Sequence, residues 1–259
     1  MTTVDIRGEP FNVRIDGAAG APSLMLSNSL GTNLAMWDAQ MPDLSGRFRV
    51  VRYDARGHGG SAVTPGPYTM EQLARDVVAL LDALEIDRTH FCGLSMGGMV
   101  GMWLGANAPE RIDRLVLCNT SPKFGAPEVF EARIKAVRQD GVASVADAVL
   151  ERWFTTRFRE RSPEALARMR AMLTATSVEG YAASCAAVRD MDHRALLPRI
   201  KRPTLVISGT HDVGTPPADG QRMVQSIEGA RYVELDSAHI SNVEAAAAFT
   251  KAVTEFLTH

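Results

Sequence analysis

The stretch F-C-G-L-S-M-G-G-M, Phe91–Met99, constrains the fold of this chain more than any other part of its sequence. It joins an apolar strand pattern to a helix pattern and contains G-x-S-x-G, with Gly93, Ser95 and Gly97 at the fixed positions. In such a tight turn the central serine takes a strained backbone conformation, and small residues two positions away on each side prevent a clash. The turn lifts the Ser95 hydroxyl clear of the sheet, at a helix N-terminus whose free N–H groups point toward developing negative charge. The pattern therefore predicts a nucleophilic serine and favours it over a glycine-rich turn of structural use only.

Strand and helix patterns alternate on both sides of this turn. They predict strands over residues 23–28, 48–54, 89–94, 114–119, 203–209 and 230–235, and helices over residues 33–44, 69–84, 96–107 and 243–256. This alternation predicts a parallel sheet with right-handed crossovers. From Pro127 to about Leu197 only helical periodicity is present. We therefore expect a core of residues 1–122 and 198–259, with a helical insertion over residues 123–197.

A serine hydroxyl needs a base at neutral pH, and the base needs a carboxylate to orient it. Of the six histidines, His239 follows the last predicted strand and therefore lies at the edge of the sheet where α/β folds assemble sites. Asp212 follows the preceding strand at the same edge. Asp236 is the rival acid, but it lies only three residues before His239 and is interpreted as a polar residue at the strand end. The sequence thus predicts a catalytic triad in the chain order Ser95, Asp212, His239.

Two backbone amides are candidates for an oxyanion hole. In folds of this kind one donor follows the nucleophile, and the other belongs to the loop after an early strand. These positions are Met96 and, in the loop S-N-S-L-G-T-N over Ser27–Asn33, Leu30. Loss of one such donor typically costs about 3 to 4 kcal/mol of transition-state stabilisation.

Composition excludes several other classes of protein. The 28 Lys and Arg residues against 30 Asp and Glu give a net charge of −2, which argues against nucleic acid as the main partner. No apolar run reaches the roughly 18 residues of a membrane span, and the first residues lack the pattern of a secretory signal. The three cysteines, Cys92, Cys118 and Cys185, are widely spaced, which predicts reduced thiols in the cytoplasm rather than disulfides or a zinc site. No heptad pattern indicates an oligomeric state, so a homo-oligomer remains open.

With these residues in place, the chain resembles the α/β-hydrolase family over essentially its whole length. The loop Y-D-A-R-G-H-G-G-S, Tyr53–Ser61, is similar to the D-x-R-G-x-G-x-S loop of that family, which is usually structural, so Arg56 and His58 are not assigned to catalysis. The resemblance implies a mostly parallel sheet of about eight strands flanked by helices. It also implies that the insertion over residues 123–197 is a helical cap, or lid, over the site.

Within that family the chain is similar to the 3-oxoadipate enol-lactonases of bacterial aromatic catabolism. The resemblance rests on the motifs N-S-L-G-T-N, G-L-S-M-G-G, S-G-T-H-D-x-x-T-P-P, A-H-I-S-N-V-E and E-R-W-F-T-T-R-F. It implies hydrolysis of 3-oxoadipate enol-lactone to 3-oxoadipate through an acyl-enzyme, in the β-ketoadipate pathway. The substrate is then a small anionic lactone, and no metal or organic cofactor is needed.

An anionic substrate predicts a cation in the site. Residues 125–200 hold 11 Arg and 1 Lys against 10 Asp and Glu, although most of these charges are expected on solvated helix faces. The candidates for the anion are Arg133 and Arg138 on the first predicted helix of the insertion and Arg157 just after Trp153. Trp153 and Trp37 are candidate walls of the pocket, with ordinary core packing as the alternative.

Other hydrolases of this fold remain alternatives, because they share the triad. They include general carboxylesterases, carbon–carbon bond hydrolases of ring-cleavage products and cofactor-free perhydrolases. Haloalkane dehalogenases and epoxide hydrolases are disfavoured, since those relatives carry Asp where this chain has Ser95. A ligand-binding receptor that keeps the fold and turns over slowly is an alternative from a different class.

Overall fold

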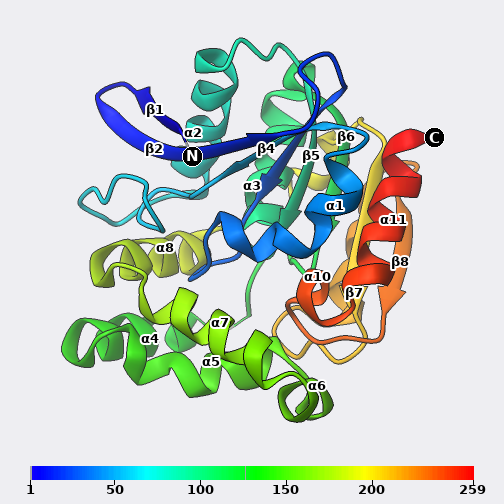
Figure 1. The fold of residues 1–259 in the computed structure, drawn as a ribbon. Helices are drawn as coiled ribbons and strands as arrows, with labels where there is room; N and C mark the ends of the chain where they lie inside the picture. Colours follow the sequence, from blue (N-terminus) through cyan, green and yellow to red (C-terminus); the bar gives the residue numbers. More distant parts are fainter. Residues whose placement is uncertain (1, 126) are drawn as a thin grey trace.

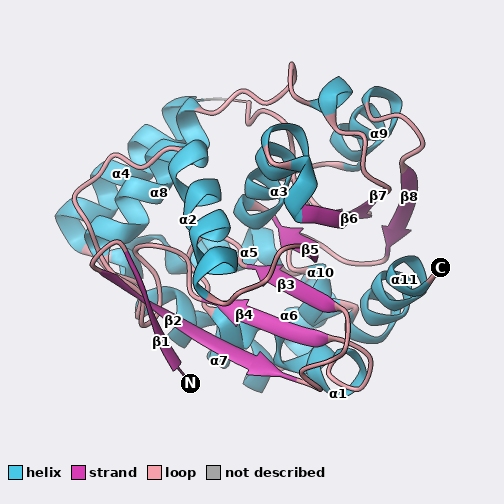
Figure 2. Ribbon diagram, turned by 90° about the horizontal axis from the view of Figure 1, so that it is seen from above, coloured by secondary structure: helices cyan, strands magenta, loops and turns pink. Residues whose placement is uncertain are grey.

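The structure, a computed structural model, describes residues 2–125 and 127–259 and is built on one eight-stranded sheet (Figures 1 and 2). The strand order is β1-β2-β4-β3-β5-β6-β7-β8. β2 runs antiparallel to both of its neighbours, β1 and β4, and all other neighbouring strands are parallel. The strands are β1 (Thr2–Ile6), β2 (Glu9–Asp16), β3 (Ser23–Ser27), β4 (Arg49–Tyr53), β5 (Thr89–Leu94), β6 (Ile112–Cys118), β7 (Thr204–Gly209) and β8 (Arg231–Leu235). The expected α/β-hydrolase architecture is therefore confirmed.

Helices cover both faces of the sheet, so its central strands are buried on both sides (Figure 2). α2 (Met70–Ala83), α3 (Met96–Asn107) and α9 (Pro217–Ser226) lie on one face, and α1 (Met41–Leu44) and α11 (Ala246–Thr258) on the other. Every residue of β5 and β7 is buried, which is why these strands read as continuous apolar runs. Short elements complete the core: α10 (Ser241–Glu244) and the 3₁₀ helices η1 (Leu34–Gln40), η2 (Pro109–Arg111) and η4 (Leu197–Arg199).

Between β6 and β7 the chain leaves the sheet and forms the helices drawn below it in Figure 1. They are α4 (Pro127–Asp140), the 3₁₀ helix η3 (Val142–Val145), α5 (Ala146–Trp153), α6 (Thr156–Arg161), α7 (Pro163–Thr174) and α8 (Val178–Asp190). The part of this segment that the structure describes contains no strand, as its helical periodicity predicts. Among the described residues, no helix is both long and apolar enough to cross a membrane.

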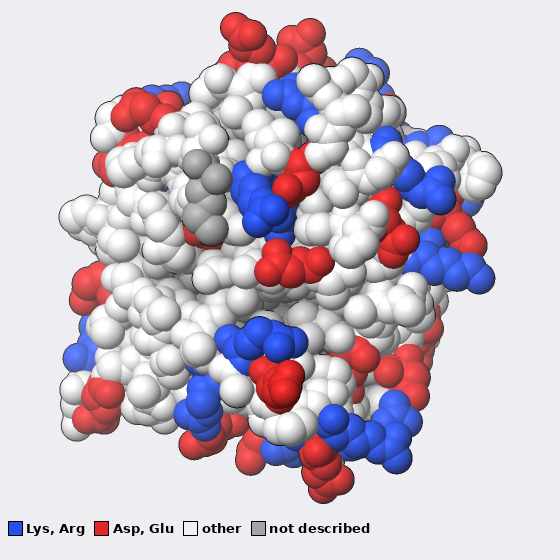
Figure 3. Space-filling view, viewed as in Figure 1, with Lys and Arg blue, Asp and Glu red and all other residues white. Residues whose placement is uncertain are grey.

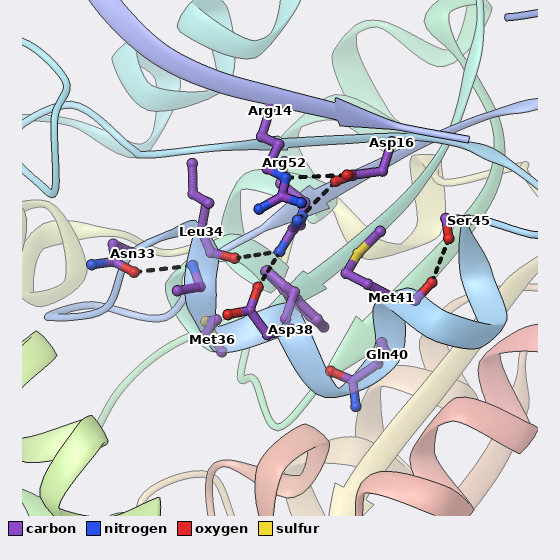
Figure 4. A network of polar contacts seen from close by, with 12 residues as sticks. Arg14, Asp16, Asn33, Leu34, Met36, Asp38, Gln40, Met41, Ser45 and Arg52 are labelled. Atoms are coloured by element: carbon purple, nitrogen blue, oxygen red, sulfur yellow. Dashed lines mark hydrogen bonds and ion pairs between the residues drawn. The ribbon is translucent and has the colours of Figure 1, made fainter. Parts of the chain in front are cut away.

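The segment expected as a helix over residues 33–44 is instead the 3₁₀ helix η1 followed by one turn of α-helix, α1. Buried polar groups fix its position (Figure 4). The Arg52 guanidinium, only 1% exposed, donates to Asp38 at 2.6 Å, to Asp16 at 2.8 Å and to the Leu34 carbonyl at 3.4 Å. The Asp54 carboxylate accepts the Leu34 N–H at 2.7 Å. These contacts hold η1 in place, and η1 begins directly after the loop that contains Leu30.

Candidate active site

Ser95 occupies the turn between β5 and α3 in a backbone conformation that side chains rarely adopt. Its φ is 55° and its ψ −113°, and the residue is 6% exposed. A Cβ on Gly93 would collide with the Gly97 carbonyl, and one on Gly97 with the Ser27 carbonyl. These collisions explain why the two flanking positions hold glycine.

Replacing Ser95 with glycine is expected to stabilise the fold. A residue with a Cβ at this φ costs on the order of 1–3 kcal/mol, and glycine removes most of that cost while giving up about 0.4–1 kcal/mol to unfolded-chain entropy. The free energy of unfolding from urea titration should therefore rise by about 1 kcal/mol. Ser95→Ala keeps the Cβ and is the matched control. A Ser95→Gly variant no more stable than Ser95→Ala would contradict a strained turn.

Ser95, His239 and Asp212 form a continuous chain of hydrogen bonds. The Ser95 Oγ lies 2.8 Å from His239 Nε2, and His239 Nδ1 lies 2.7 Å from Asp212 Oδ2. His239 follows β8 and Asp212 follows β7, and all three side chains are buried. This is the arrangement in which an imidazole takes a hydroxyl proton while a carboxylate fixes its tautomer.

Besides His239, several other groups hold the Asp212 carboxylate. It accepts the N–H groups of Gly214 at 2.9 Å and Thr215 at 3.0 Å, the Thr215 hydroxyl at 2.6 Å and the Asn119 amide at 3.2 Å. Burial alone would raise the pKa of Asp212, but the attraction of His239 and these hydrogen bonds together lower it. The group at this position is therefore a carboxylate at neutral pH.

Asn119 and Thr120, in the turn after β6, join the parts of the site and were not predicted from the sequence. The Asn119 amide donates to both Asp212 and the Ala238 carbonyl, next to His239. The Thr120 hydroxyl donates to the Ser95 carbonyl at 2.8 Å, and the Ser95 N–H donates to Cys118. The sequence does contain a signal for these two residues. The stretch N-T-S-P follows a strand at its carboxyl end, in the same way that polar residues follow β7 and β8.

The backbone amides of Leu30 and Met96 lie beside Ser95 and are free to donate. Leu30 lines the same cavity as Ser95, and Met96 is the first residue of α3. Among the described residues, neither amide has a hydrogen-bond acceptor in the protein, whereas the neighbouring amides of Ser29, Gly31 and Gly97 do. Free N–H groups at a helix start next to a hydroxyl are suited to receiving an oxyanion.

Ser95 and His239 open into a cavity of about 230 Å³ that the residues of α4, α5 and α8 close from the opposite side. Trp153, at the end of α5, forms part of its wall, as does Tyr181 of α8. The Trp153 carbonyl accepts the Ile240 N–H at 3.1 Å, so this wall is bound to the loop of His239. The cavity thus has its polar reactive groups on the sheet side and mostly apolar walls on the helical side.

Two arginines, Arg133 of α4 and Arg152 of α5, supply the positive charge of the cavity. Both are half-buried, and neither forms an ion pair with a carboxylate among the described residues. Burial lowers the pKa of Arg152, and the neighbouring charge of Arg133 lowers it further. Burial raises the pKa of Tyr181 beside them to about 12, so its hydroxyl remains a hydrogen-bond donor. Elsewhere, on the face shown in Figure 3, cations and anions are interspersed.

Three of the five predicted substrate contacts need correction, because they do not line the cavity. Arg138 does not line the cavity; it is exposed and pairs with Glu179 at 3.3 Å. Arg157 pairs with Asp236 at 2.8 Å on the surface. Trp37 is buried in the core behind the site, where its indole N–H donates to Asn28 at 2.8 Å. Arg152 was missed, although it adjoins Trp153 in the sequence. Of the five predicted substrate contacts, only Arg133 and Trp153 line the cavity.

Comparison with known proteins gives close matches over the whole chain. Residues 22–246 match the family model described as alpha/beta hydrolase fold. The 3-oxoadipate enol-lactonase 2 of Acinetobacter baylyi is 42% identical over 97% of this chain and 94% of that protein. The crystal structure of the enol-lactonase from Burkholderia xenovorans LB400 matches with a TM-score of 0.98 and 51% identity, covering 100% of both chains. A thermophilic esterase from Thermogutta terrifontis matches with a TM-score of 0.92 and 29% identity, over 99% of this chain and 97% of that one.

Proposed function

This chain belongs to the alpha/beta hydrolase fold family and is a hydrolase, and we propose that it opens the ring of 3-oxoadipate enol-lactone to give 3-oxoadipate. The observation that carries the proposal is one cavity that holds the Ser95–His239 pair together with two arginines that pair with no carboxylate among the described residues. The identities of 36% and 42% to two 3-oxoadipate enol-lactonases of A. baylyi support the same substrate.

In the proposed first half-reaction, Ser95 attacks the lactone carbonyl while His239 Nε2 takes its proton. Asp212, 2.7 Å from Nδ1, stabilises the imidazolium that forms. The amides of Leu30 and Met96 donate to the oxyanion. When the tetrahedral intermediate collapses, the ring C–O bond breaks and the enol oxygen takes the proton back from His239.

In the second half-reaction, His239 takes a proton from water, whose oxygen attacks the acyl carbon bound to Ser95. The C–O bond to Ser95 breaks, the serine regains its proton, and the second carboxylate of the product is released. The enol formed in the first half-reaction becomes a ketone without further catalysis by the chain. An enol leaves more easily than an alkoxide, so acylation needs no additional electrophile.

The arginines are proposed to hold the carboxylate that the lactone carries. A guanidinium pairs well with a carboxylate, and in a cavity that excludes most water the pairing is stronger than at a surface. We propose that residues 123–197 act as the cap that brings these two cations over Ser95. We further propose a place for this reaction in the β-ketoadipate pathway. We also propose that the protein acts in the cytoplasm, because Cys92 and Cys118 are free thiols although their Sγ atoms lie 3.8 Å apart.

A substrate panel tests this function. Purified protein is given the enol-lactone, its neutral methyl ester, p-nitrophenyl acetate and a ring-fission diene, with Ser95→Ala as the control. We expect the highest kcat/KM for the anionic enol-lactone. A preference for the neutral esters would instead identify a general carboxylesterase, and turnover of the diene a carbon–carbon bond hydrolase.

The variants Arg133→Met and Arg152→Met are expected to raise KM for the charged lactone more than KM for its neutral ester. Each loses a charge-assisted hydrogen bond of about 1.5–3 kcal/mol, so KM for the anionic lactone should rise roughly 10- to 100-fold. KM for the methyl ester should change by less than about three-fold, because packing is nearly kept. Arg138→Met, on the exposed side of α4, is the matched control and should leave both constants unchanged. Equal changes of KM for both substrates would show that the two arginines do not bind the substrate carboxylate.

A further inference from the structure

His58 lies under the turn that carries the Leu30 amide, and the reaction described above does not use it. Its ring is 1% exposed. The Gly31 N–H donates to His58 Nε2 at 3.0 Å, and the other ring nitrogen, Nδ1, lies 3.1 Å from the Arg56 carbonyl oxygen. The imidazole therefore bridges two loops that are far apart in the sequence.

The four residues Ser29–Thr32 form a tight turn. The Thr32 N–H donates to the Ser29 carbonyl at 3.2 Å, and Gly31 has a φ of 78°. A hydrogen bond from the fourth residue to the first, with a glycine at about +80° in third place, is the pattern of a type II turn. In that turn the central peptide, between Leu30 and Gly31, can rotate by about 180° to give a type I turn unless something selects one orientation. The bond from Gly31 to His58 makes that selection.

The partners of the ring determine which nitrogen carries the proton. A carbonyl oxygen can only accept, so Nδ1 must donate to Arg56, and Nε2 then offers its lone pair to the Gly31 N–H. Burial lowers the pKa of His58, opposed by the Arg56 carbonyl and by the charge of Asp54, which keeps this neutral form. A proton on Nε2 would face the Gly31 N–H and break the contact.

The loop that holds His58 is itself anchored to α2 and α8. The Arg56 guanidinium makes two hydrogen bonds of 2.8 Å to the Asp76 carboxylate. A Cβ on Gly57 would come within 2.6 Å of the Gly180 Cα, so this loop packs directly against α8. These contacts hold the loop of His58 in place and position its Nε2 as an acceptor for the turn.

We propose that His58 is a positioning residue for the oxyanion hole: its Nε2 lone pair holds the Gly31 N–H and so anchors the Ser29–Thr32 turn at the residue that directly follows Leu30. The Leu30 N–H belongs to the preceding peptide of the same turn, and it is held in place with the turn as a whole. The inference rests on the proposed role of the Leu30 amide in ester hydrolysis and does not depend on the identity of the ester. The His58 ring itself touches no reacting atom.

A set of three variants tests this role by kinetics. His58→Leu removes the acceptor, His58→Gln can present an amide oxygen to Gly31, and His90→Leu removes an imidazole that is 7% exposed and packs edge-on against Phe48. We expect His58→Leu to lower kcat about 10- to 100-fold with KM within about two-fold, because misplacing an oxyanion donor weakens transition-state binding only. His58→Gln should recover most of the loss, and His90→Leu should retain full kcat.

The wild-type protein provides an independent test that no folding defect can obscure. With ¹⁵N-labelled histidine, the ring nitrogen shifts report the tautomer of His58, assigned by the loss of its signals in His58→Gln. The proposal requires a protonated Nδ1 and an unprotonated Nε2 across the pH range of activity. A protonated Nε2 would overturn it.

The kinetic results also have a defined contrary outcome. A His58→Gln variant no better than His58→Leu, or a loss that raises KM as much as it lowers kcat, would reduce His58 to a structural residue. All rates are measured on p-nitrophenyl acetate as well as on the enol-lactone. Hydrolysis of the acetate without hydrolysis of the lactone would overturn the proposed substrate and leave the comparison of His58 variants valid.

Discussion

Ser95→Ala is expected to lower kcat for the enol-lactone by about 10⁴- to 10⁶-fold. The hydroxyl 2.8 Å from His239 Nε2 is the only group that the proposed mechanism acylates, and alanine leaves the base without a nucleophile to activate. Binding should survive, because the arginines and the apolar walls of the cavity are unchanged. Rates measured by loss of the lactone chromophore, and a dissociation constant measured by calorimetry, separate the two effects.

Ser184→Ala is the matched control for this variant. Ser184 is fully buried in α8, and its hydroxyl has no hydrogen-bond partner among the described residues. Its loss should leave kcat within about two-fold of the wild-type value. Retention of more than a few per cent of kcat in Ser95→Ala would show that the ring opens without this serine.

Asp212→Asn is expected to lower kcat by about 10⁴-fold while the chain stays folded. An asparagine NH₂ group facing His239 Nδ1 would donate where the carboxylate accepts. The imidazole would then carry its proton on Nε2 and could not receive one from Ser95. Asp236→Asn, which changes the rival carboxylate paired with Arg157 and His211, should leave kcat within about two-fold.

The same variant has a stability effect whose sign depends on pH. Because the folded protein lowers the pKa of Asp212, its ionised form stabilises the fold above the unfolded-state pKa of about 3.9. That stabilisation is lost as the pH falls through the lower folded-state pKa. Thermal melts should therefore show Asp212→Asn less stable than wild type at neutral pH, with the difference shrinking in acid. A difference that grows in acid would contradict the lowered pKa.

Local patterns in the sequence predicted the groups that follow the strands. Ser95 directly follows β5, and Asp212 and His239 come within four residues of the ends of β7 and β8. Parallel strands bring such positions to one edge of the sheet. The hairpin of β1 and β2 escaped prediction, although Arg7 and Gly8 both take positive φ in the two-residue turn that joins them. Only the glycine signals that geometry in a sequence, and a single glycine is common.

The cavity residues were harder to predict because helix phase and tertiary packing select them. Arg133 and Arg138 lie five positions apart on α4, so their side chains point about 140° apart and one face can hold only one of them. Arg152 could be placed only once α5 was packed against the loop of His239 through Trp153. Trp37 was expected to line the cavity but lies in the core, where its indole N–H donates to Asn28.

Acid quenching within the first turnover of the enol-lactone, followed by peptide mass mapping, tests the acyl-enzyme on Ser95 most directly. We expect wild-type protein to carry an adduct with the mass of one lactone on the peptide containing Ser95, and this adduct should decay as 3-oxoadipate appears. An adduct of the same mass on another residue, or one that persists in Ser95→Ala, would contradict covalent catalysis by this serine.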